Sequence, residues 1–316
     1  MSRSASPGVE LVGREITLTR TFDAPRSLVF KAWTEAEHVA QWWGPQGFTN
    51  PVCEVDARVG GAVRIHMQGP DGGIYPMRGV FQELVPPERI VLLTGVDEAD
   101  GNTRFEVLTT VTLVEEEGRT KLTLRAKVVI ATADAVMNIA GMEPGWSQSL
   151  DRLQAHVAPD QEIPAREFVT ERVIGAPTAL VFRAWTEPDR VAEWWGPNGF
   201  TNTIHEMDGR PGGMWRLTMH GPDGRNYLNE NVYLQVVPPA LLVYYHQTSP
   251  KFVAVATFED APGGTRVTMR SNFLSSDDFD TAMNVFGARE GATQTLARLA
   301  EYVGRMGAEA HGQMNA

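Results

Sequence analysis

Four polar side chains alternate along one short segment in the second half of the chain. They stand two residues apart, at Tyr227, Asn229, Asn231 and Tyr233. In a β-strand they would share one face, because successive residues point to opposite sides. A buried polar group without a partner costs about 1–3 kcal/mol, so two core-facing asparagines need water, each other or a ligand. The pattern predicts a polar-lined cavity, unless the strand is turned by one residue and both amides face solvent.

His246 follows two tyrosines in the next strand-like segment and could join this polar group. If the protein is an enzyme, we expect His246 as the acid or base, with Tyr227 or Tyr233 polarising an oxygen atom. The single cysteine, Cys53, has no repeated partner, and no Gly-x-Ser-x-Gly segment is present. The histidine spacings match no common zinc motif. We therefore predict no metal and no cofactor, and binding rather than catalysis.

The first half of the chain carries a drier version of this polar strand. The equivalent positions hold Tyr75, Met77, Gly79 and Phe81, and Thr94 stands in place of His246. The strand before it also alternates in both halves. Its apolar members, which we expect to face the interior, are Val63, Ile65 and Met67 in the first half and Trp215, Leu217 and Met219 in the second. Its polar members, including Arg64 and Arg216, should face solvent.

Tryptophans are paired at the end of a short predicted helix in each half, as Trp42-Trp43 and as Trp194-Trp195. Most tryptophans at such a junction pack in the core or under a lid. An indole also offers a large rigid apolar surface with one donor, so direct contact with a ligand is the alternative. Trp146, on the last helix of the first half, is a further candidate for ligand contact.

These pairs belong to an internal repeat. The segment Trp-Trp-Gly-Pro at Trp42 recurs 152 residues later at Trp194, whereas Met137 recurs 146 residues later as Met283. A period near 150 residues exceeds that of solenoids and is long enough for a separate core. We expect the missing residues of the second copy near 97–101 and 115–118. The predicted organisation is a disordered lead-in at 1–13, a domain at 14–158, a linker at 159–165, a domain at 166–306 and a flexible tail at 307–316.

Each copy shows one order of elements. A strand at 16–22 precedes two short helices, the first opened by Ala24-Pro25 and the second at 35–42. The closing helix of each copy has a single apolar stripe and should therefore lie on the apolar face of a sheet. Strand-like segments stand between the helices, at 52–57, 62–68, 74–83, 89–94, 105–114 and 120–130.

This order, together with Val-Phe-x-Ala-Trp-Thr, Trp-Trp-Gly-Pro, a Gly-Gly pair and Gly-Pro-Asp-Gly, resembles the heat-shock protein 90 ATPase activator homologue-like family. That family lies in the SRPBCC (START/Bet v1-like) superfamily, and the resemblance covers both copies. It implies two α+β helix-grip domains, in which a curved antiparallel sheet wraps a long C-terminal helix and leaves a cavity. Superfamily relatives carry lipids, sterols, polyketides or hormones there, and a few catalyse cyclisation or hydration.

The full eukaryotic activator also has an N-terminal domain with an Asn-x-Asn-Asn-Trp-His-Trp motif, which nothing in this sequence matches. The resemblance therefore does not carry chaperone contact over to this chain.

The composition limits the partners. The chain of 316 residues has 28 Lys and Arg against 39 Asp and Glu, with a net charge of −11. No Lys/Arg run overcomes that field, so we expect no nucleic acid or anionic membrane as partner. No segment approaches the ~18 apolar residues of a membrane span, and the first residues lack the apolar core of a signal peptide. We expect a cytoplasmic protein.

The favoured function is binding of a small hydrophobic or amphipathic ligand, one cavity per domain. The first alternative is a cyclase or hydrolase that uses the second domain alone. The second is a protein-interaction role, as a co-chaperone-like protein or as a self-resistance protein that sequesters a natural product. The two domains could also pack on each other within the chain.

Overall fold

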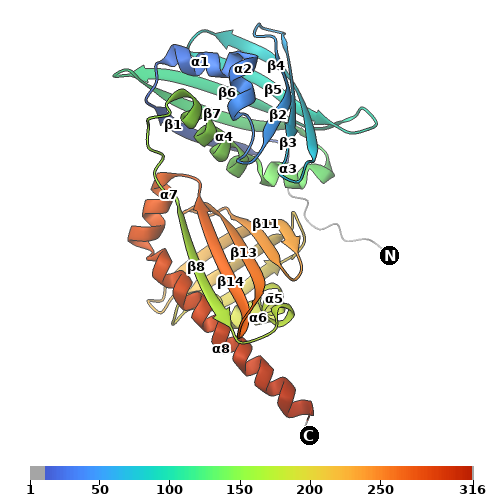
Figure 1. The fold of residues 1–316 in the computed structure, drawn as a ribbon, viewed down its shortest axis with the longest axis vertical. Helices are drawn as coiled ribbons and strands as arrows, with labels where there is room; N and C mark the ends of the chain where they lie inside the picture. The colour runs from blue at the N-terminus through green and yellow to red at the C-terminus, as the bar shows by residue number, and fades with distance from the viewer. Residues whose placement is uncertain (1–10, 315–316) are drawn as a thin grey trace. The chain divides into compact units, whose positions relative to one another are not determined.

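The computed structural model describes residues 11–314, with side chains to residue 306, and the chain divides into two compact units between Ile163 and Pro164 (Figure 1). Each unit contains one seven-stranded antiparallel sheet, and the strand order is the same in both. The first and last strands of each unit pair with each other in the sheet. Two α+β domains of helix-grip architecture, as the sequence predicts, are therefore confirmed.

The first domain places two short helices after its first strand and a long helix at its end. Its sheet has the order β1-β7-β6-β5-β4-β3-β2. The elements are β1 (Glu15–Phe22), α1 (Arg26–Thr34), α2 (Ala36–Trp42), β2 (Thr49–Val55), β3 (Ala62–Gln68), β4 (Ile74–Val85), β5 (Arg89–Asp97), β6 (Thr103–Glu116), β7 (Arg119–Ala131), η1 (Ala133–Ala135), α3 (Val136–Ala140) and α4 (Met142–Val157).

The second domain repeats this plan, with the sheet order β8-β14-β13-β12-β11-β10-β9. One difference precedes the long helix, where η2 is a turn of π-helix. The elements are β8 (Glu167–Ile174), α5 (Thr178–Thr186), α6 (Pro188–Trp194), β9 (Thr201–Met207), β10 (Met214–His220), β11 (Asn226–Val237), β12 (Leu241–His246), β13 (Phe252–Ala261), β14 (Gly264–Phe273), α7 (Ser276–Asp280), η2 (Thr281–Val285) and α8 (Ala288–Met314).

Residue alternation orients β3 as predicted. Val63 and Ile65 are buried, whereas Arg64 is exposed and forms an ion pair with Glu54 at 3.5 Å. Apolar side chains on every second residue give the sheet one face that can cover a core. The strand's orientation is thus set by its own sequence.

The two domains differ in length at one hairpin. Pairing between β5 and β6 extends to Asp97 and Thr103, but pairing between β12 and β13 already ends at His246 and Phe252. The expected second difference near 115–118 is wrong, because the next hairpin closes with a two-residue turn in both domains. No shared motif fixes the alignment of that turn, so the sequences alone could not place it.

The first domain extends further toward the N-terminus than predicted. Leu11 is buried in the core, and the backbone N–H of Gly13 donates to the carbonyl oxygen of Val128 at 2.8 Å. Most of the predicted lead-in, residues 1–10, lies outside the described residues, as do residues 315–316. The sequence predicts a tail from residue 307, whereas α8 is helical to Met314.

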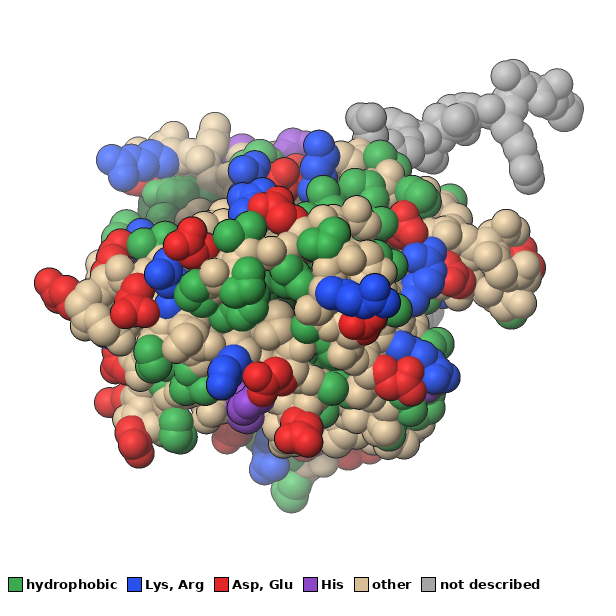
Figure 2. All heavy atoms as spheres, turned by 90° about the horizontal axis from the view of Figure 1, so that it is seen from above, with side chains coloured by type: hydrophobic (Ala, Val, Ile, Leu, Met, Phe, Trp, Pro, Cys, Tyr) green, Lys and Arg blue, Asp and Glu red, His purple; other side chains and the backbone are tan. Residues whose placement is uncertain are grey.

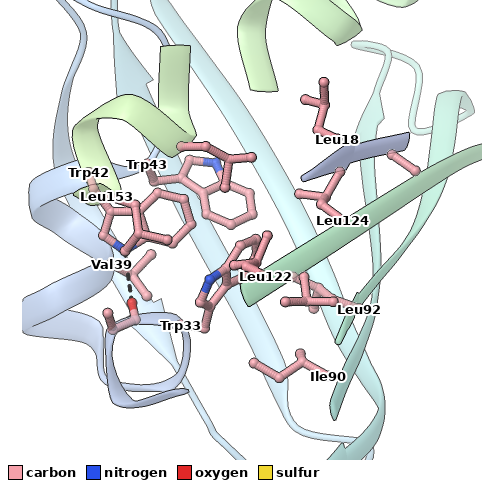
Figure 3. Close-up of a cluster of buried hydrophobic side chains, with 14 of the residues drawn as sticks. Leu18, Trp33, Val39, Trp42, Trp43, Ile90, Leu92, Leu122, Leu124 and Leu153 are labelled. Atoms are coloured by element: carbon pink, nitrogen blue, oxygen red, sulfur yellow. Dashed lines mark hydrogen bonds between the residues drawn. The ribbon is translucent and has the colours of Figure 1, made fainter. Parts of the chain in front are cut away.

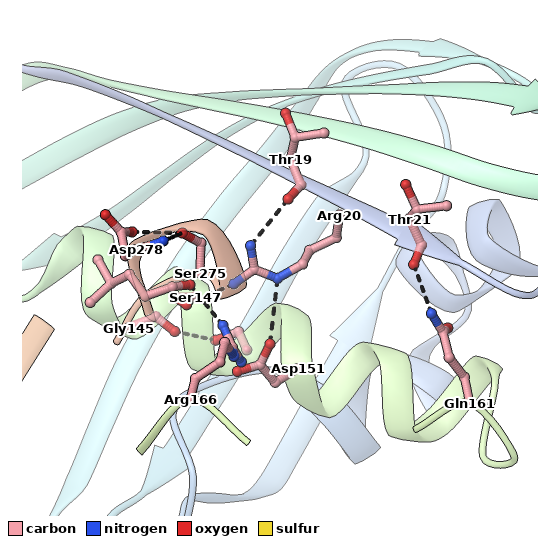
Figure 4. Close-up of polar contacts among 12 residues, drawn as sticks. Thr19, Arg20, Thr21, Gly145, Ser147, Asp151, Gln161, Arg166, Ser275 and Asp278 are labelled. Atoms are coloured by element: carbon pink, nitrogen blue, oxygen red, sulfur yellow. Dashed lines mark hydrogen bonds and ion pairs between the residues drawn. The ribbon is translucent and has the colours of Figure 1, made fainter. Parts of the chain in front are cut away.

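The long helix α4 packs on its sheet through polar as well as apolar contacts (Figure 4). The guanidinium of Arg20 on β1 donates to the Ser147 hydroxyl at 2.9 Å and contacts the Asp151 carboxylate at 3.4 Å. Beyond the helix, the side chain of Gln161 donates to the carbonyl oxygen of Thr21 at 3.1 Å. These contacts fasten the end of the domain to its first strand.

The surface carries both signs of charge. On the face drawn in Figure 2, Lys and Arg side chains are interspersed with Asp and Glu. Most ion pairs on the described residues join exposed or half-exposed side chains, as between Arg210 and Asp208 at 2.7 Å. In the described part of the chain, no helix has the length and apolar composition needed to cross a membrane.

Candidate functional site

A cavity of about 530 Å³ lies in the second domain between the sheet and α8. Residues from β8 and from β10 to β14 form the sheet side, and Ala292 and Thr295 on α8 form part of the opposite side. Aromatic side chains dominate the wall. They are Phe168, Trp195, Phe200, Tyr227, Tyr244, Phe252, Phe273 and Phe286. A molecule in the cavity would therefore contact mainly apolar surfaces, many of them the faces and edges of aromatic rings.

Hydrogen-bonding groups in the wall are few and neutral. Asn229, His246, Thr248, Ser249, Ser271 and Thr295 line the cavity, in addition to Tyr227 and Tyr244. No Asp, Glu, Lys or Arg is among the described residues that line it. A molecule bound there would meet polar partners but no counter-ion.

The polar residues of β11 and β12 form a buried hydrogen-bond chain. Asn231 and His246 stand directly opposite each other on the two strands. The side-chain Nδ2 of Asn231 donates to the carbonyl oxygen of Trp215 at 3.2 Å, and its Oδ1 lies 2.9 Å from Nδ1 of His246. The other ring nitrogen of His246, Nε2, lies 2.8 Å from the hydroxyl of Thr248. Asn231 lies behind the wall, whereas His246 and Thr248 are exposed to the cavity.

Burial keeps His246 neutral. It lowers the pKa of the imidazole from 6.5 to about 4, because the charged form loses its hydration. The ring of Phe252 stacks on the imidazole with the ring centres 4.7 Å apart. At neutral pH, His246 is therefore an uncharged hydrogen-bonding group with both nitrogens partnered.

The two core tyrosines differ in position. Tyr244 lines the cavity, and burial raises the pKa of its hydroxyl above the usual range. Tyr233 is fully buried among other aromatic rings and does not line the cavity, and its hydroxyl has no partner among the described residues. The expectation that Tyr233 polarises an oxygen of a bound molecule is therefore wrong, because Trp215 and Tyr244 pack against its ring.

The Trp-Trp-Gly-Pro segment after α6 forms one wall through Trp195, Gly196 and Pro197. Arg298 on α8 fixes this segment, since its Nη1 donates to all three carbonyl oxygens at 3.3, 2.9 and 2.7 Å. Nδ2 of Asn202 also donates to the carbonyl oxygen of Trp195, at 2.8 Å. The wall is thus held by side chains from α8 and β9.

Arg298 was not among the residues predicted from the sequence. The signal was available, because Arg152 stands 146 residues earlier and makes the same contacts in the first domain, at 3.2, 3.0 and 3.0 Å. Thr248, which lies in the loop between β12 and β13, was not predicted either. That loop differs in length from its counterpart, so no repeated residue marks it.

A segment between β14 and α8 covers another side of the cavity. Ala282, Val285 and Phe286 of this segment line the cavity. Asp278 ties the segment to the loop after β12, because its Oδ1 accepts from the backbone N–H of Lys251 at 2.9 Å. Its Oδ2 accepts from the hydroxyl of Ser275 at 2.6 Å (Figure 4). Val285 and Phe286 remain 71% and 50% exposed, so the rim of the cavity is apolar and open to solvent.

The second-domain residues that the sequence predicted to line a cavity separate into two groups. Trp195, Met219, Tyr227, Asn229 and His246 line it. The others lie behind the wall, since Trp194, Trp215, Asn231 and Tyr233 are all buried in the core. For Trp194 the reason is a hydrogen bond from its Nε1 to the carbonyl oxygen of Ala184 at 2.9 Å, which points the indole into the helix pair.

In the first domain the predicted tryptophans Trp42 and Trp43 pack beside Trp33 in the hydrophobic core (Figure 3). Trp42, Trp43 and Phe81 are buried in the core, and Met67, Met77 and Trp146 are half-buried against it. Like Trp194, Trp42 donates to a helix carbonyl, that of Ala32, at 2.8 Å. These side chains fill the space beside α4 with rings, as the packing reading of the tryptophans expects.

Tyr75 does not face this interior. It is 45% exposed, and its ring lies against Phe48 with the centres 5.8 Å apart. Its counterpart Tyr227 lies under Phe286, with the ring centres 6.4 Å apart, whereas the first domain has Ala140 at the position of Phe286. The absence of that covering ring explains why Tyr75 is exposed.

Residues 23–158 and 175–304 match the family described as Activator of Hsp90 ATPase homolog 1-like protein. Among solved structures, protein CV1439 from Chromobacterium violaceum is 31% identical over 46% of this chain and 98% of its own, with a TM-score of 0.39. Protein NE0264 from Nitrosomonas europaea is 24% identical over 46% of this chain and 99% of its own, with a TM-score of 0.41. The AHSA1 (SPO3351) protein from Silicibacter pomeroyi is 23% identical over 47% and 100%, with a TM-score of 0.41. No curated protein matches the chain.

Proposed function

Since the chain belongs to the family of Activator of Hsp90 ATPase homolog 1-like proteins, with two tandem copies, we propose that its second domain binds a small hydrophobic or amphipathic molecule. The supporting observation is the cavity of about 530 Å³ between the sheet and α8. Small-molecule sites are typically concave, mostly apolar and furnished with a few fixed polar groups. The aromatic wall and the Asn231–His246–Thr248 chain have that character.

The cavity is large enough to enclose a drug-sized molecule. Volumes of about 300–1,000 Å³ are usual for sites that enclose a drug-sized ligand. Its exposed apolar rim, formed by Leu228, Val285 and Phe286, gives such a molecule a way in from solvent. Exposed apolar side chains gathered in one place often mark a binding site.

His246 supports binding better than catalysis. A general acid or base works best when its pKa lies near the operating pH, whereas burial lowers that of His246 to about 4. Both ring nitrogens are already hydrogen-bonded within the protein. We therefore favour a binding role for this histidine over a cyclase or hydrolase mechanism.

Native mass spectrometry of the gently purified full chain tests the proposal. We expect excess mass that organic extraction removes and that returns when the extract is added back. In Ala292→Trp an indole would occupy the cavity, so this variant should carry no excess mass. Thr293→Trp adds the same group on the exposed side of α8 and is the matched control, which should keep the mass.

Two outcomes of this experiment would contradict binding in the second-domain cavity. If neither the purified chain nor the extracted chain incubated with lipids and neutral aromatic compounds gains mass, the second domain does not bind such molecules. Excess mass that persists in a folded Ala292→Trp variant would place the bound molecule elsewhere.

A further inference from the structure

We propose that the molecule bound in the second-domain cavity is an uncharged aromatic compound that donates a hydrogen bond to the hydroxyl oxygen of Thr248. This inference rests on the proposed binding function and goes beyond it by naming the chemistry of the ligand. Three features of the cavity carry it: the lack of charge in its wall, the density of aromatic rings, and the direction of the hydrogen bonds that end at Thr248.

The wall excludes a charged ligand. No Asp, Glu, Lys or Arg is among the described residues that line the cavity. The guanidinium of Arg298, which fixes the Trp195–Pro197 segment of the wall, directs its Nη1 donor to the carbonyl oxygens of Trp195, Gly196 and Pro197. An ion that leaves water without a partner loses several kcal/mol of hydration free energy, about the whole affinity of a modest ligand. An uncharged molecule avoids that loss.

Aromatic rings favour an aromatic ligand. Phe252 and Phe273 lie in contact on adjacent strands, with ring centres 5.2 Å apart, and both line the cavity. Trp195 and Tyr244 line it as well and pack against the same indole, that of Trp215, at 4.7 and 5.4 Å. Aromatic pairs contribute about 0.5–1.5 kcal/mol beyond the area they bury. A flat ring system can form several such pairs in this cavity.

The direction of the hydrogen bonds follows from Asn231. The carbonyl oxygen of Trp215 can only accept, so the amide nitrogen of Asn231 must face it and its Oδ1 must face His246. That oxygen also can only accept, so Nδ1 of His246 carries the proton. A neutral imidazole has one N–H, which leaves Nε2 as an acceptor.

Thr248 is the last residue of this hydrogen-bond chain. Its single hydroxyl proton is donated to Nε2 of His246 across 2.8 Å. The hydroxyl oxygen then has only lone pairs to offer the cavity that Thr248 lines. A ligand group beside it must therefore donate, as a phenol hydroxyl or an amine N–H does. Asn231 and His246 are positioning residues, and Thr248 determines specificity.

The first domain lacks the Asn231–His246–Thr248 hydrogen-bond chain. Gly79 and Thr94 form the cross-strand pair that corresponds to Asn231 and His246, and the Thr94 hydroxyl donates to the carbonyl oxygen of Val107. Both members of this cross-strand pair differ between the two domains, which indicates that Asn231 and His246 act together. Burying such an amide and imidazole is costly unless each polar atom has a partner, as it has here.

A pair of compounds that differ in one donor tests the inference. The full chain is titrated with 2-naphthol and with 2-methoxynaphthalene, which keeps the rings and the oxygen but has no proton to donate. We expect 2-naphthol to bind about threefold to tenfold more tightly, the value of one net hydrogen bond. Thr248→Val keeps the shape of the side chain and should abolish the difference, whereas Thr248→Ser should retain it.

A second pair tests the charge. N-phenyl-1-naphthylamine is neutral, and 1-anilinonaphthalene-8-sulfonate adds one anionic group to the same rings. We expect the sulfonate to bind at least about tenfold more weakly, since the wall supplies no cation. Thermal unfolding of each variant checks that it is folded, and Thr248→Ala replaces Thr248→Val if the latter is not.

Three results would overturn the inference: equal affinity of the wild type for both naphthalenes, a naphthol preference that survives in folded Thr248→Val, or equal affinity for the sulfonate and its neutral counterpart. If no neutral naphthalene binds while native mass spectrometry shows an extractable molecule, the ligand class is wrong and the binding function stands. If neither is found, both fail.

Discussion

Trp146 and Trp215 each supply the fourth indole of a tryptophan cluster, although they stand at different positions of the repeat. Trp146 comes from the helix α4 and stacks on Trp33 at 5.8 Å, whereas Trp215 comes from the strand β10 and contacts Trp195 at 4.7 Å. The first domain has Val63 at the position of Trp215, and the second has Ala292 at the position of Trp146. Moving the ring from helix to sheet leaves space beside α8, where Ala292 lines the cavity.

This exchange predicts unequal effects of removing the two rings. Trp215 is fully buried and Trp146 is half-buried, so Trp215→Ala leaves the larger void. We expect Trp215→Ala to destabilise the second domain by about 3–5 kcal/mol and Trp146→Ala to destabilise the first by less. Hydrogen exchange followed by mass spectrometry resolves the two domains. Equal losses of stability in the two variants would show that burial does not determine how much each ring contributes to the stability of its domain.

Arg298 should be needed for binding, and Arg152 should not. Both arginines hold three successive carbonyl oxygens, but only the segment held by Arg298 lines the cavity of about 530 Å³. Each replacement by methionine should cost its own domain about 2 kcal/mol of stability, as expected for hydrogen bonds from a charged donor.

The measurement is titration of both variants with 2-naphthol, at a temperature where both remain folded. We expect Arg298→Met to weaken binding several-fold and Arg152→Met to leave it unchanged. If Arg152→Met weakens binding as much, the effect does not come from the wall of the cavity.

Local patterns were sufficient to predict the order of elements and a long helix lying on an antiparallel sheet, whereas the helix-grip architecture was implied by the family resemblance. Alternation places Val63 and Ile65 inside and Arg64 outside, and the apolar stripe of α4 requires a sheet to lie on. The site was harder to predict because its members depend on neighbours distant in the sequence. Tyr75 and Tyr227 occupy the same position of the repeat, yet only Tyr227 is also covered by a ring from the segment before the long helix, that of Phe286.

The polar residues of the cavity show a second limit of prediction from the sequence. Alternation correctly brings Asn229 and Asn231 to the inner face of β11, but it cannot say which of them reaches the cavity and which is enclosed behind it. Thr248 lies in a loop without periodicity, so its place beside His246 became visible only from the structure.

Tyr233→Phe should stabilise the second domain. The hydroxyl of Tyr233 is buried without a partner among the described residues, and the first domain has Phe81 at this position. Removing an unsatisfied buried group recovers its desolvation penalty, so we expect a gain of about 1 kcal/mol. Urea unfolding measures the gain. Because Tyr233 does not line the cavity, affinity for 2-naphthol should stay the same, and a lower stability would show that the hydroxyl is satisfied in solution.

His246 should make the second domain sensitive to acid. Burial lowers the pKa of its imidazole from 6.5 to about 4, so between these pH values the unfolded chain binds a proton that the folded chain does not. The stabilisation is therefore complete above pH 6.5 and falls as the pH drops toward 4, by at most about 3 kcal/mol.

The matched control replaces Asn231 and His246 together by the first domain's pair, as Asn231→Gly with His246→Thr. Unfolding of the second domain is followed by hydrogen exchange between pH 7 and pH 4. Burial and the neighbouring His38 also lower the pKa of His156, but His156 lies in the first domain and is retained in the variant. We expect the wild type to lose stability over this range more steeply than the double variant. Parallel curves would mean that the buried imidazole does not cause the acid sensitivity.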